Sequence, residues 1–327
     1  MLDSKLTFEN HINEKIAIAR KGIGIIKFIS TFSPIKTLDQ IYKMFVRPHL
    51  DYCDVKFHSP PISDPYTANV HLTSAMERIE RIQYQAALSI TGCWQGTSRN
   101  KLYEELGWES LSDRRWARRL TCFYKIVHDN SPAYLYEHVP ALRLPMYGQL
   151  VSRGFHEIRC RTGKYMNSFF PHSVKIWNQI GEDFRSCDSL RKFKLSLISL
   201  IRPPKKETYG IHNPLGIRNL FRLRLGLSSL KRHKKLHNFE DTPYDTCDCQ
   251  QAPEDCFHFL FRCSLFLHLR GNFLHDVLVI LRKYALTDQA ENVDIYLYGH
   301  RTINFEDNRA IMNATIDYIC SSGRFTC

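Results

Sequence analysis

Residues 111–128, LSDRRWARRLTCFYKIVH, repeat apolar side chains with the period of an α-helix. The apolar positions are Trp116, Leu120, Phe123 and Val127. Their spacing of three or four residues is typical of one buried helix face. We expect four arginines on the other sides of this helix, namely Arg114, Arg115, Arg118 and Arg119. The stretch therefore predicts a helix that packs on one face and carries cations elsewhere.

Helical periodicity continues on both sides of this stretch. Helices are expected over residues 6–30 (with Thr7 as cap), from Ser33 to before Pro48, and over about 70–91, 172–180, 188–201, 264–285 and 306–321. Residues 58–66 predict a loop, and Pro203-Pro204-Lys205-Lys206 predicts a linker. The predicted fold class is mainly α. We expect an N-terminal helical bundle over residues 1–130, an irregular connector with short helices over 131–215, and a basic helix with a small Cys/His module over 216–327.

Positive charge is concentrated in one part of the sequence. Between Arg191 and Lys235 there are 13 Lys and Arg residues and one acidic residue, Glu207. The net charge of this stretch, +12, equals the net charge of the whole chain. Such a stretch suits a polyanionic partner, because each neutralised phosphate releases counterions. Residues 216–237 predict a basic amphipathic helix. Its candidate phosphate contacts are Arg218, Arg222, Arg224, Lys231, Arg232, Lys234 and Lys235.

Aromatic residues near this basic stretch are candidates for stacking on unpaired bases. They are Trp177, Tyr209 and Phe221. The alternative is a solvated helix face whose aromatic residues belong to the core. Both interpretations are compatible with the sequence.

A cluster of metal-ligand residue types follows the basic stretch. Cys247, Cys249, His258 and Cys263 have the spacing C-x-C-x8-H-x4-C. Three thiolates and one imidazole can complete a tetrahedral zinc site, and four protein ligands leave no position for water, so such a zinc ion is structural. Cys256 is a spare ligand that could replace Cys249. The alternative is a set of ordinary reduced cysteines.

The remaining sequence excludes several protein classes. No apolar run reaches the roughly 18 residues of a membrane span, so no membrane partner is expected. The 11 cysteines are odd in number and mostly scattered, which favours reduced thiols and a nuclear or cytoplasmic location. No spacing of Ser and His suggests a nucleophile with its base, so a hydrolase is not indicated.

Several short motifs resemble a known family in their order along the chain. They are Lys5-Leu6-Thr7-Phe8, Val46-Arg47-Pro48-His49-Leu50-Asp51-Tyr52, Met76-Glu77-Arg78-Ile79-Glu80-Arg81-Ile82-Gln83, Tyr103-Glu104-Glu105-Leu106-Gly107, Ser152-Arg153-Gly154, Ile176-Trp177-Asn178 and Leu223-Arg224-Leu225-Gly226-Leu227. Together they resemble the region after the polymerase core in non-LTR retrotransposon (LINE, jockey- and CR1-like) reverse transcriptases, over roughly residues 2–270. Pro171 and Gly181 depart from the family pattern.

The resemblance implies a thumb-like region, a connector and a zinc-binding-like end of an RNA-directed DNA polymerase. Its partners would be RNA or DNA and the upstream polymerase core. In the thumb-like region Arg114, Arg115, Arg118 and Arg119 would grip a template–primer duplex, or would simply pair with nearby acidic residues. The family holds two Mg²⁺ ions on adjacent aspartates, and this sequence has no Asp-Asp pair. We therefore expect no Mg²⁺ site and no catalysis by this chain alone.

Two other functions fit the same sequence. The chain could be a degenerate relic of such an element, which would fold partly or not at all. It could also be a host-repurposed nucleic-acid-binding or scaffold protein that works without a polymerase.

Overall fold

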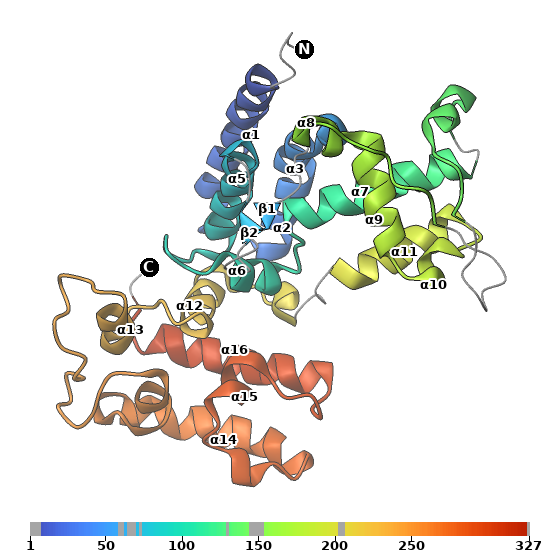
Figure 1. Ribbon diagram of the computed structural model, residues 1–327. Coiled ribbons are helices and arrows are strands. Elements are labelled where there is room, and N and C mark those ends of the chain that lie inside the picture. Colours follow the sequence, from blue (N-terminus) through green and yellow to red (C-terminus); the bar gives the residue numbers. More distant parts are fainter. Residues whose placement is uncertain are drawn as a thin grey trace. The chain divides into compact units, whose positions relative to one another are not determined.

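The computed structural model describes residues 8–57, 62–63, 70–71, 74–128, 131–143, 154–201 and 207–325 (Figure 1). These residues are mainly helical, which confirms the predicted fold class. Their one sheet consists of the antiparallel strands β1 (Ile62–Ser63) and β2 (Val70–His71), in which Ile62 pairs with His71. The predicted cap Thr7 and the predicted linker at residues 203–206 lie outside the described residues, as does most of the predicted loop at 58–66.

The chain forms two compact units. Unit 1 comprises Met1–Arg20, Phe45–Gln83 and Gly107–Pro204. Unit 2 comprises Lys21–Met44, Tyr84–Leu106 and Lys205–Cys327. The units are interleaved along the chain, whereas the sequence suggested three consecutive segments. Interleaving arises from packing between residues far apart in sequence, and composition and linkers carry no signal for it.

Unit 1 has its core where α7 packs against α9 and α11. Its elements are α3 (Arg47–Asp51), α4 (Asp54–Phe57), α7 (Leu111–Val127), the 3₁₀ helix η2 (Ala133–His138), α8 (Gly163–Met166), α9 (Phe169–Gln179), α10 (Glu182–Arg185) and α11 (Leu190–Ile201), with the first parts of α1 (Glu9–Ile29) and α5 (Ser74–Thr91). The ring of Phe123 in α7 lies 5.4 Å from that of Trp177 in α9, and Phe193 of α11 contacts the same indole. The apolar face predicted for residues 111–128 thus packs inward at Leu120 and Phe123, which are fully buried.

Unit 2 is built around α16, which packs against α12, α14 and α15. Its elements are α2 (Ile35–Ile41), α6 (Arg99–Leu106), α12 (Pro214–Arg224), α13 (Lys231–Leu236), α14 (Leu267–Lys283), α15 (Val293–Tyr298), α16 (Phe305–Ser321), the 3₁₀ helices η3 (Glu207–Gly210), η5 (Ser264–Phe266) and η6 (Thr287–Gln289), and the π-helix η4 (His258–Arg262). Gly216 allows α12 to approach α16 closely, because a Cβ at this position would lie 2.3 Å from Cγ2 of Ile316.

The prediction of a single basic helix over residues 216–237 is wrong. The structure has two helices there, α12 and α13, separated by a turn. Gly226 adopts a left-handed conformation (φ 69°), and the amide of Leu227 donates to the carbonyl of Arg222 at 3.0 Å. This pattern is a Schellman C-cap, which ends α12 because the chain cannot continue as a right-handed helix.

The helix predicted to end before Pro48 continues past it. A π-helix, η1 (Tyr42–Val46), follows α2, and α3 begins at Arg47 with Pro48 in its first turn. Proline is tolerated there because the first turn of a helix has no intrahelical acceptor for its missing N–H. Helices α6 and α15 were not predicted, because both are short.

Among the described residues, one helical segment, Ser264–Lys283, is long and apolar enough to cross a membrane by length and composition alone. Core helices of globular proteins meet the same criterion. This segment contains α14, which packs against α16 and buries Phe273, Val277 and Leu281. The absence of a membrane partner stays a prediction.

Candidate metal centre and basic surfaces

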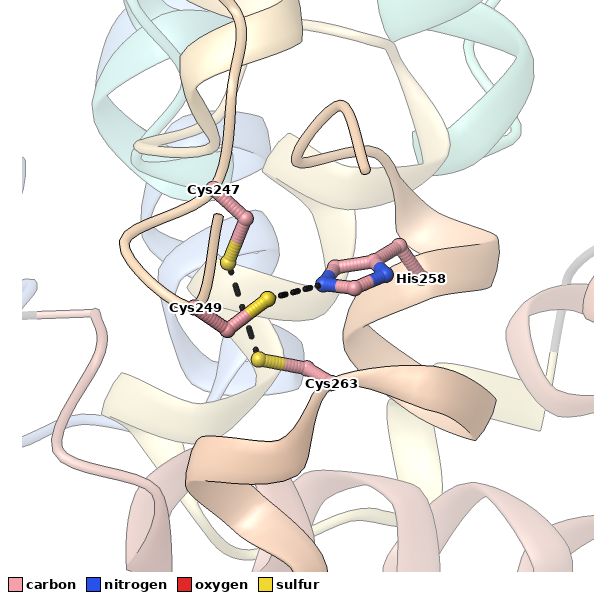
Figure 2. Close-up of side chains that lie close together, drawn as sticks. All are labelled: Cys247, Cys249, His258 and Cys263. Carbon is pink, nitrogen blue, oxygen red and sulfur yellow. Dashed lines mark hydrogen bonds between the residues drawn. The ribbon is translucent and has the colours of Figure 1, made fainter. Parts of the chain in front are cut away.

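The four predicted metal ligands lie together in unit 2 (Figure 2). The ligand atoms of Cys247, Cys249, His258 and Cys263 are all within 4.8 Å of one another. Sγ of Cys247 lies 3.6 Å from Sγ of Cys263, and Sγ of Cys249 lies 3.1 Å from Nε2 of His258. Two thiolates bound tetrahedrally to zinc lie about 3.8 Å apart, given zinc–sulfur bonds of about 2.3 Å. The arrangement is therefore compatible with a zinc ion.

A tight turn brings the two N-terminal ligands to the same side of their loop. The amide of Gln250 donates to the carbonyl of Cys247 at 2.9 Å, and Gln250 has a φ of 61°. The amide of Cys247 donates to the carbonyl of Ala252, also at 2.9 Å, next to an antiparallel bridge between Thr246 and Pro253. These contacts close the loop and allow ligands separated by one residue to converge.

The two C-terminal ligands are placed by the π-helix η4. The amide of Cys263 donates to the carbonyl of His258 at 2.7 Å, a hydrogen bond between residues five apart. In an α-helix such residues point in clearly different directions, whereas the wider π turn brings them closer to alignment. Oδ1 of Asp255 accepts from the amide of His258 at 2.8 Å and caps the start of this segment.

The pKa values of the candidate ligands determine how readily a metal ion replaces their protons. Burial raises the pKa of Cys247 to about 12. At Cys249 burial acts in the same direction, but hydrogen bonds from the Gln251 amide and from the neighbouring thiols lower the pKa. Burial also lowers the pKa of His258, which keeps its imidazole neutral and able to bind a metal. Zinc binding must release thiol protons, so its affinity should rise with pH.

Cys256, the predicted spare ligand, belongs to a different contact. Its Sγ lies 3.9 Å from Nε2 of His233, whose Nδ1 lies 2.8 Å from Oγ of Ser228. Burial raises the pKa of the Cys256 thiol to about 12. Cys249, rather than Cys256, completes the group of four.

Helix α13 carries four of the predicted phosphate contacts, and each forms an ion pair. The pairs are Lys231 with Asp248 (2.5 Å), Arg232 with Asp255 (2.9 Å), Lys234 with Asp241 (2.8 Å) and Lys235 with Asp245 (2.9 Å). The acidic partners come from the loop that contains Cys247 and Cys249. The side chains of Arg232 and Lys235 remain 48% exposed. These cations are at the surface, but neighbouring carboxylates balance their charge.

The arginines of α12 are structural rather than exposed. Arg224 is buried, donates to Oε2 of Glu105 at 2.8 Å and donates to the carbonyl of Leu297. Arg218 donates to the carbonyl of Ser89 at 3.2 Å, and Arg222 donates to the carbonyl of Gly92 at 2.8 Å. The prediction that Arg224 contacts phosphate is corrected, because the guanidinium lies inside the unit against a carboxylate.

The sequence suggested that all four arginines of α7 lie away from the core. Two of them are buried instead. Arg115 and Arg119 are each 1% exposed. Arg119 donates to the carbonyls of Val55 and Ser168 at 3.1 and 3.2 Å, and burial lowers its pKa to about 10. Neither guanidinium is accessible to a nucleic-acid backbone.

The other two arginines of α7 lie nearer the surface and pair with carboxylates. Arg114 contacts Asp51 and Glu109 at 2.5 and 2.6 Å. Arg118 contacts Asp51 and Asp54 at 2.7 and 2.9 Å. Pairing with acidic residues was one of the two interpretations open for these arginines, and it describes both of them.

Trp177 is also placed differently from the stacking prediction. It is 1% exposed and sits among Phe123, Phe155 and Phe193. Its indole is a core side chain and offers no ring face to an unpaired base.

A basic surface in unit 1 was not anticipated. Arg159, Arg161 and Lys164 are exposed, and the neighbouring Tyr165 is 50% exposed. No acidic residue occurs between Glu157 and Glu182 in the sequence. This acid-free interval was the available signal, and the stronger charge density after Arg191 obscured it.

The fold also redistributes the net charge. Unit 1 contains 23 basic and 16 acidic residues, and unit 2 contains 22 and 17, so the net charges are +7 and +5. The basic excess that appeared focused in the sequence is therefore shared between the units.

Comparison with protein-family models, with curated proteins and with solved structures found no match to this chain. The resemblance to non-LTR retrotransposon reverse transcriptases stays a prediction that rests on the quoted motifs.

Proposed function

We propose that this chain is a nucleic-acid-binding protein whose Cys247, Cys249, His258 and Cys263 hold a structural zinc ion. We further propose that it corresponds to the thumb, connector and zinc-binding-like end of a non-LTR retrotransposon reverse transcriptase. In this proposal the chain binds RNA or DNA for a polymerase active site that it does not itself supply.

The observation that carries the proposal is the direct connection between the metal centre and the basic helix α13. The amide of Lys231 donates to Oε2 of Glu254 at 2.8 Å, and the amide of Arg232 donates to the carbonyl of Glu254 at 3.2 Å. Asp248, the partner of Lys231, lies between the ligands Cys247 and Cys249. A zinc ion that orders this loop would also fix the start of α13, so metal binding would organise the cationic surface.

The ion pairs of α13 are compatible with phosphate binding. Exposed pairs of this kind contribute only about 0–1 kcal/mol each. A phosphodiester can therefore replace a carboxylate partner of Lys234 or Lys235 at small cost, with counterion release from the nucleic acid as the driving force. The exposed cations Arg159, Arg161 and Lys164 add a second basic surface.

A salt titration of nucleic-acid affinity tests the proposal. The zinc-loaded chain should bind labelled RNA or duplex DNA at low salt. If roughly 6 phosphates are contacted, log K should fall with log salt at a slope of about −4 to −5. Replacing Lys231, Arg232, Lys234 and Lys235 by glutamine should make this slope shallower by about 3–4. No detectable binding at low salt would refute the proposal.

The matched control removes the same charge from other exposed positions of unit 2. Suitable residues are Lys36, Lys101, Arg282 and Arg301, all of which are exposed. If the control variant loses as much affinity as the α13 variant, net charge alone explains binding and the role of α13 is refuted.

A further inference from the structure

An aromatic pair beside the basic helix has the properties of a base-stacking site. The rings of Trp94 and Phe239 lie 5.4 Å apart at an interplanar angle of 46°. Phe239 is 36% exposed and Trp94 is half-buried, so neither residue is enclosed in the core. The guanidinium of Arg222 lies 5.4 Å from the centre of the Trp94 ring. All three residues belong to unit 2.

The backbone holds Phe239 in place through the C-cap of α13. Asn238 adopts a left-handed conformation (φ 55°), and its amide donates to the carbonyl of Lys235 at 3.0 Å. The amide of Phe239 donates to the carbonyl of Lys234 at 3.1 Å. These two hydrogen bonds form a Schellman motif, so the backbone of Phe239 is held at the end of the cationic helix.

Trp94 is fixed from the other side by its own loop. The carbonyl of Trp94 accepts from Oγ1 of Thr97 at 2.7 Å. The hydroxyl of Tyr84 donates to the carbonyl of Thr97 at 2.9 Å and accepts from the amide of Gly96 at 3.2 Å. A preorganised aromatic surface loses little entropy when a ligand stacks on it.

Cationic groups accompany the rings. Lys235, whose side chain is 48% exposed, is joined to Phe239 through the C-cap, and His237 between them is exposed. Arg222 approaches the opposite member of the ring pair. Aromatic rings next to cations are the combination with which proteins bind unpaired bases and their phosphodiester backbone. A duplex cannot use it in the same way, because its bases are already stacked and paired.

We propose that Trp94 and Phe239 form a stacking platform that makes unit 2 selective for single-stranded nucleic acid over duplex. One unpaired base stacks on the exposed rings, and a flanking phosphate contacts Lys235. This inference rests on the proposed function and specifies the class of nucleic acid that the same surface takes.

The test compares affinities of the full zinc-loaded chain for oligouridylate, oligothymidylate and a duplex DNA, measured by fluorescence anisotropy. Phe239→Leu keeps an apolar contact with Trp94 but removes the aromatic ring. We expect it to weaken single-strand binding about tenfold, the effect of losing one stacked base, and to leave duplex binding unchanged. Phe239→Tyr should retain wild-type affinity, because it keeps the ring.

Two further measurements separate stacking from packing. Phe305→Leu is the matched control, since Phe305 is 52% exposed in unit 2 and should not affect binding. Oligouridylate should quench tryptophan fluorescence, and Trp94→Phe should abolish this quenching. If Phe239→Leu changes the circular dichroism spectrum, the quenching measurement decides whether a base stacks on the ring pair.

The possible outcomes distinguish the two proposals. Equal affinity for single strands and duplex, or wild-type single-strand affinity in Phe239→Leu, overturns the stacking platform and leaves the proposed function standing. Failure to bind any of the three polynucleotides overturns both. Comparable affinity for oligouridylate and oligothymidylate indicates that the site recognises unpaired bases in general, and a preference for one shows that the sugar or the C5 methyl group of the base contributes.

Discussion

Helices α12 and α13 are neighbours in sequence and similarly basic, yet their cations have different roles. Arg224 of α12 is buried against Glu105, and its guanidinium lies 5.1 Å from the centre of the Tyr298 ring. Lys231 and Lys235 of α13 form ion pairs near the surface. Charge density along a sequence therefore does not show whether cations hold a fold together or face a partner. Burial separates the two roles, and it should also separate the effects of mutations.

The largest effect should come from removing the metal, on which the proposed surface role of α13 depends. Structural zinc contributes about 10–16 kcal/mol of apparent binding free energy in small zinc domains at pH 7. Chelation, or Cys263→Ser, should therefore disorder the 245–263 region and reduce nucleic-acid affinity. Zinc content and cobalt absorption measure occupancy, and circular dichroism measures the lost order. Cys320→Ser, at an exposed thiol, should leave both unchanged.

The next effect should come from the buried pair of α12. Arg224→Met leaves Glu105 as a buried carboxylate without its guanidinium partner. Breaking one side of such a pair costs about 3–5 kcal/mol. Urea denaturation should show this loss, and the double variant with Glu105→Gln should recover part of it. A loss below about 1 kcal/mol would place Arg224 with the exposed cations of α13 and break the comparison.

A buried cation should also influence a titratable neighbour. Burial, together with the charge of Arg119 at 3.0 Å, lowers the pKa of His172 from 6.5 to about 4. The unfolded chain therefore takes up a proton at a higher pH than the folded chain. The stabilising contribution is complete above about pH 6.5 and is lost as the pH falls towards 4.

At pH 5 this loss should be about 1 kcal/mol, after allowance for the partial exposure of His172. Urea denaturation of a Trp94→Phe background follows unit 1, because Trp108, Trp116 and Trp177 all lie in that unit. His172→Gln should remove the difference between pH 7 and pH 5. An unchanged pH dependence would show that the titration of His172 does not account for the loss of stability at pH 5.

The smallest effect should come from a single surface pair. Lys234→Ala removes the contact with Asp241 and should change the free energy of unfolding by less than about 1 kcal/mol. The same substitution should weaken nucleic-acid binding at low salt and not at high salt. A large loss of stability here would mean that α13 has the structural role assigned to α12.

Part of the fold was predictable because its signals are local. The helical period of residues 111–127 lies within one segment. The metal ligands were predictable for a similar reason, since Cys and His at these spacings have few other roles in combination. The four residues lie close together in space, which agrees with that prediction.

The rest was not predictable because it depends on distant residues. Arg224 and Glu105 are 119 residues apart, and no local pattern shows that they meet. Arg115 and Arg119 look like polar-face residues, but Glu80 and the carbonyl of Val55 lie where α7 packs. Gly226 is of a residue type that often ends a helix, but the continuous basic pattern around it concealed the break.

The π turn between His258 and Cys263 has an evolutionary consequence. A π turn holds one more residue than an α-helical turn. Loss of a single codon between these two positions would restore a regular α-helical turn and leave the histidine and the cysteine four residues apart, which again places them on one helix face. A related protein could thus keep both ligands on a regular α-helix with an interval one residue shorter than that between His258 and Cys263.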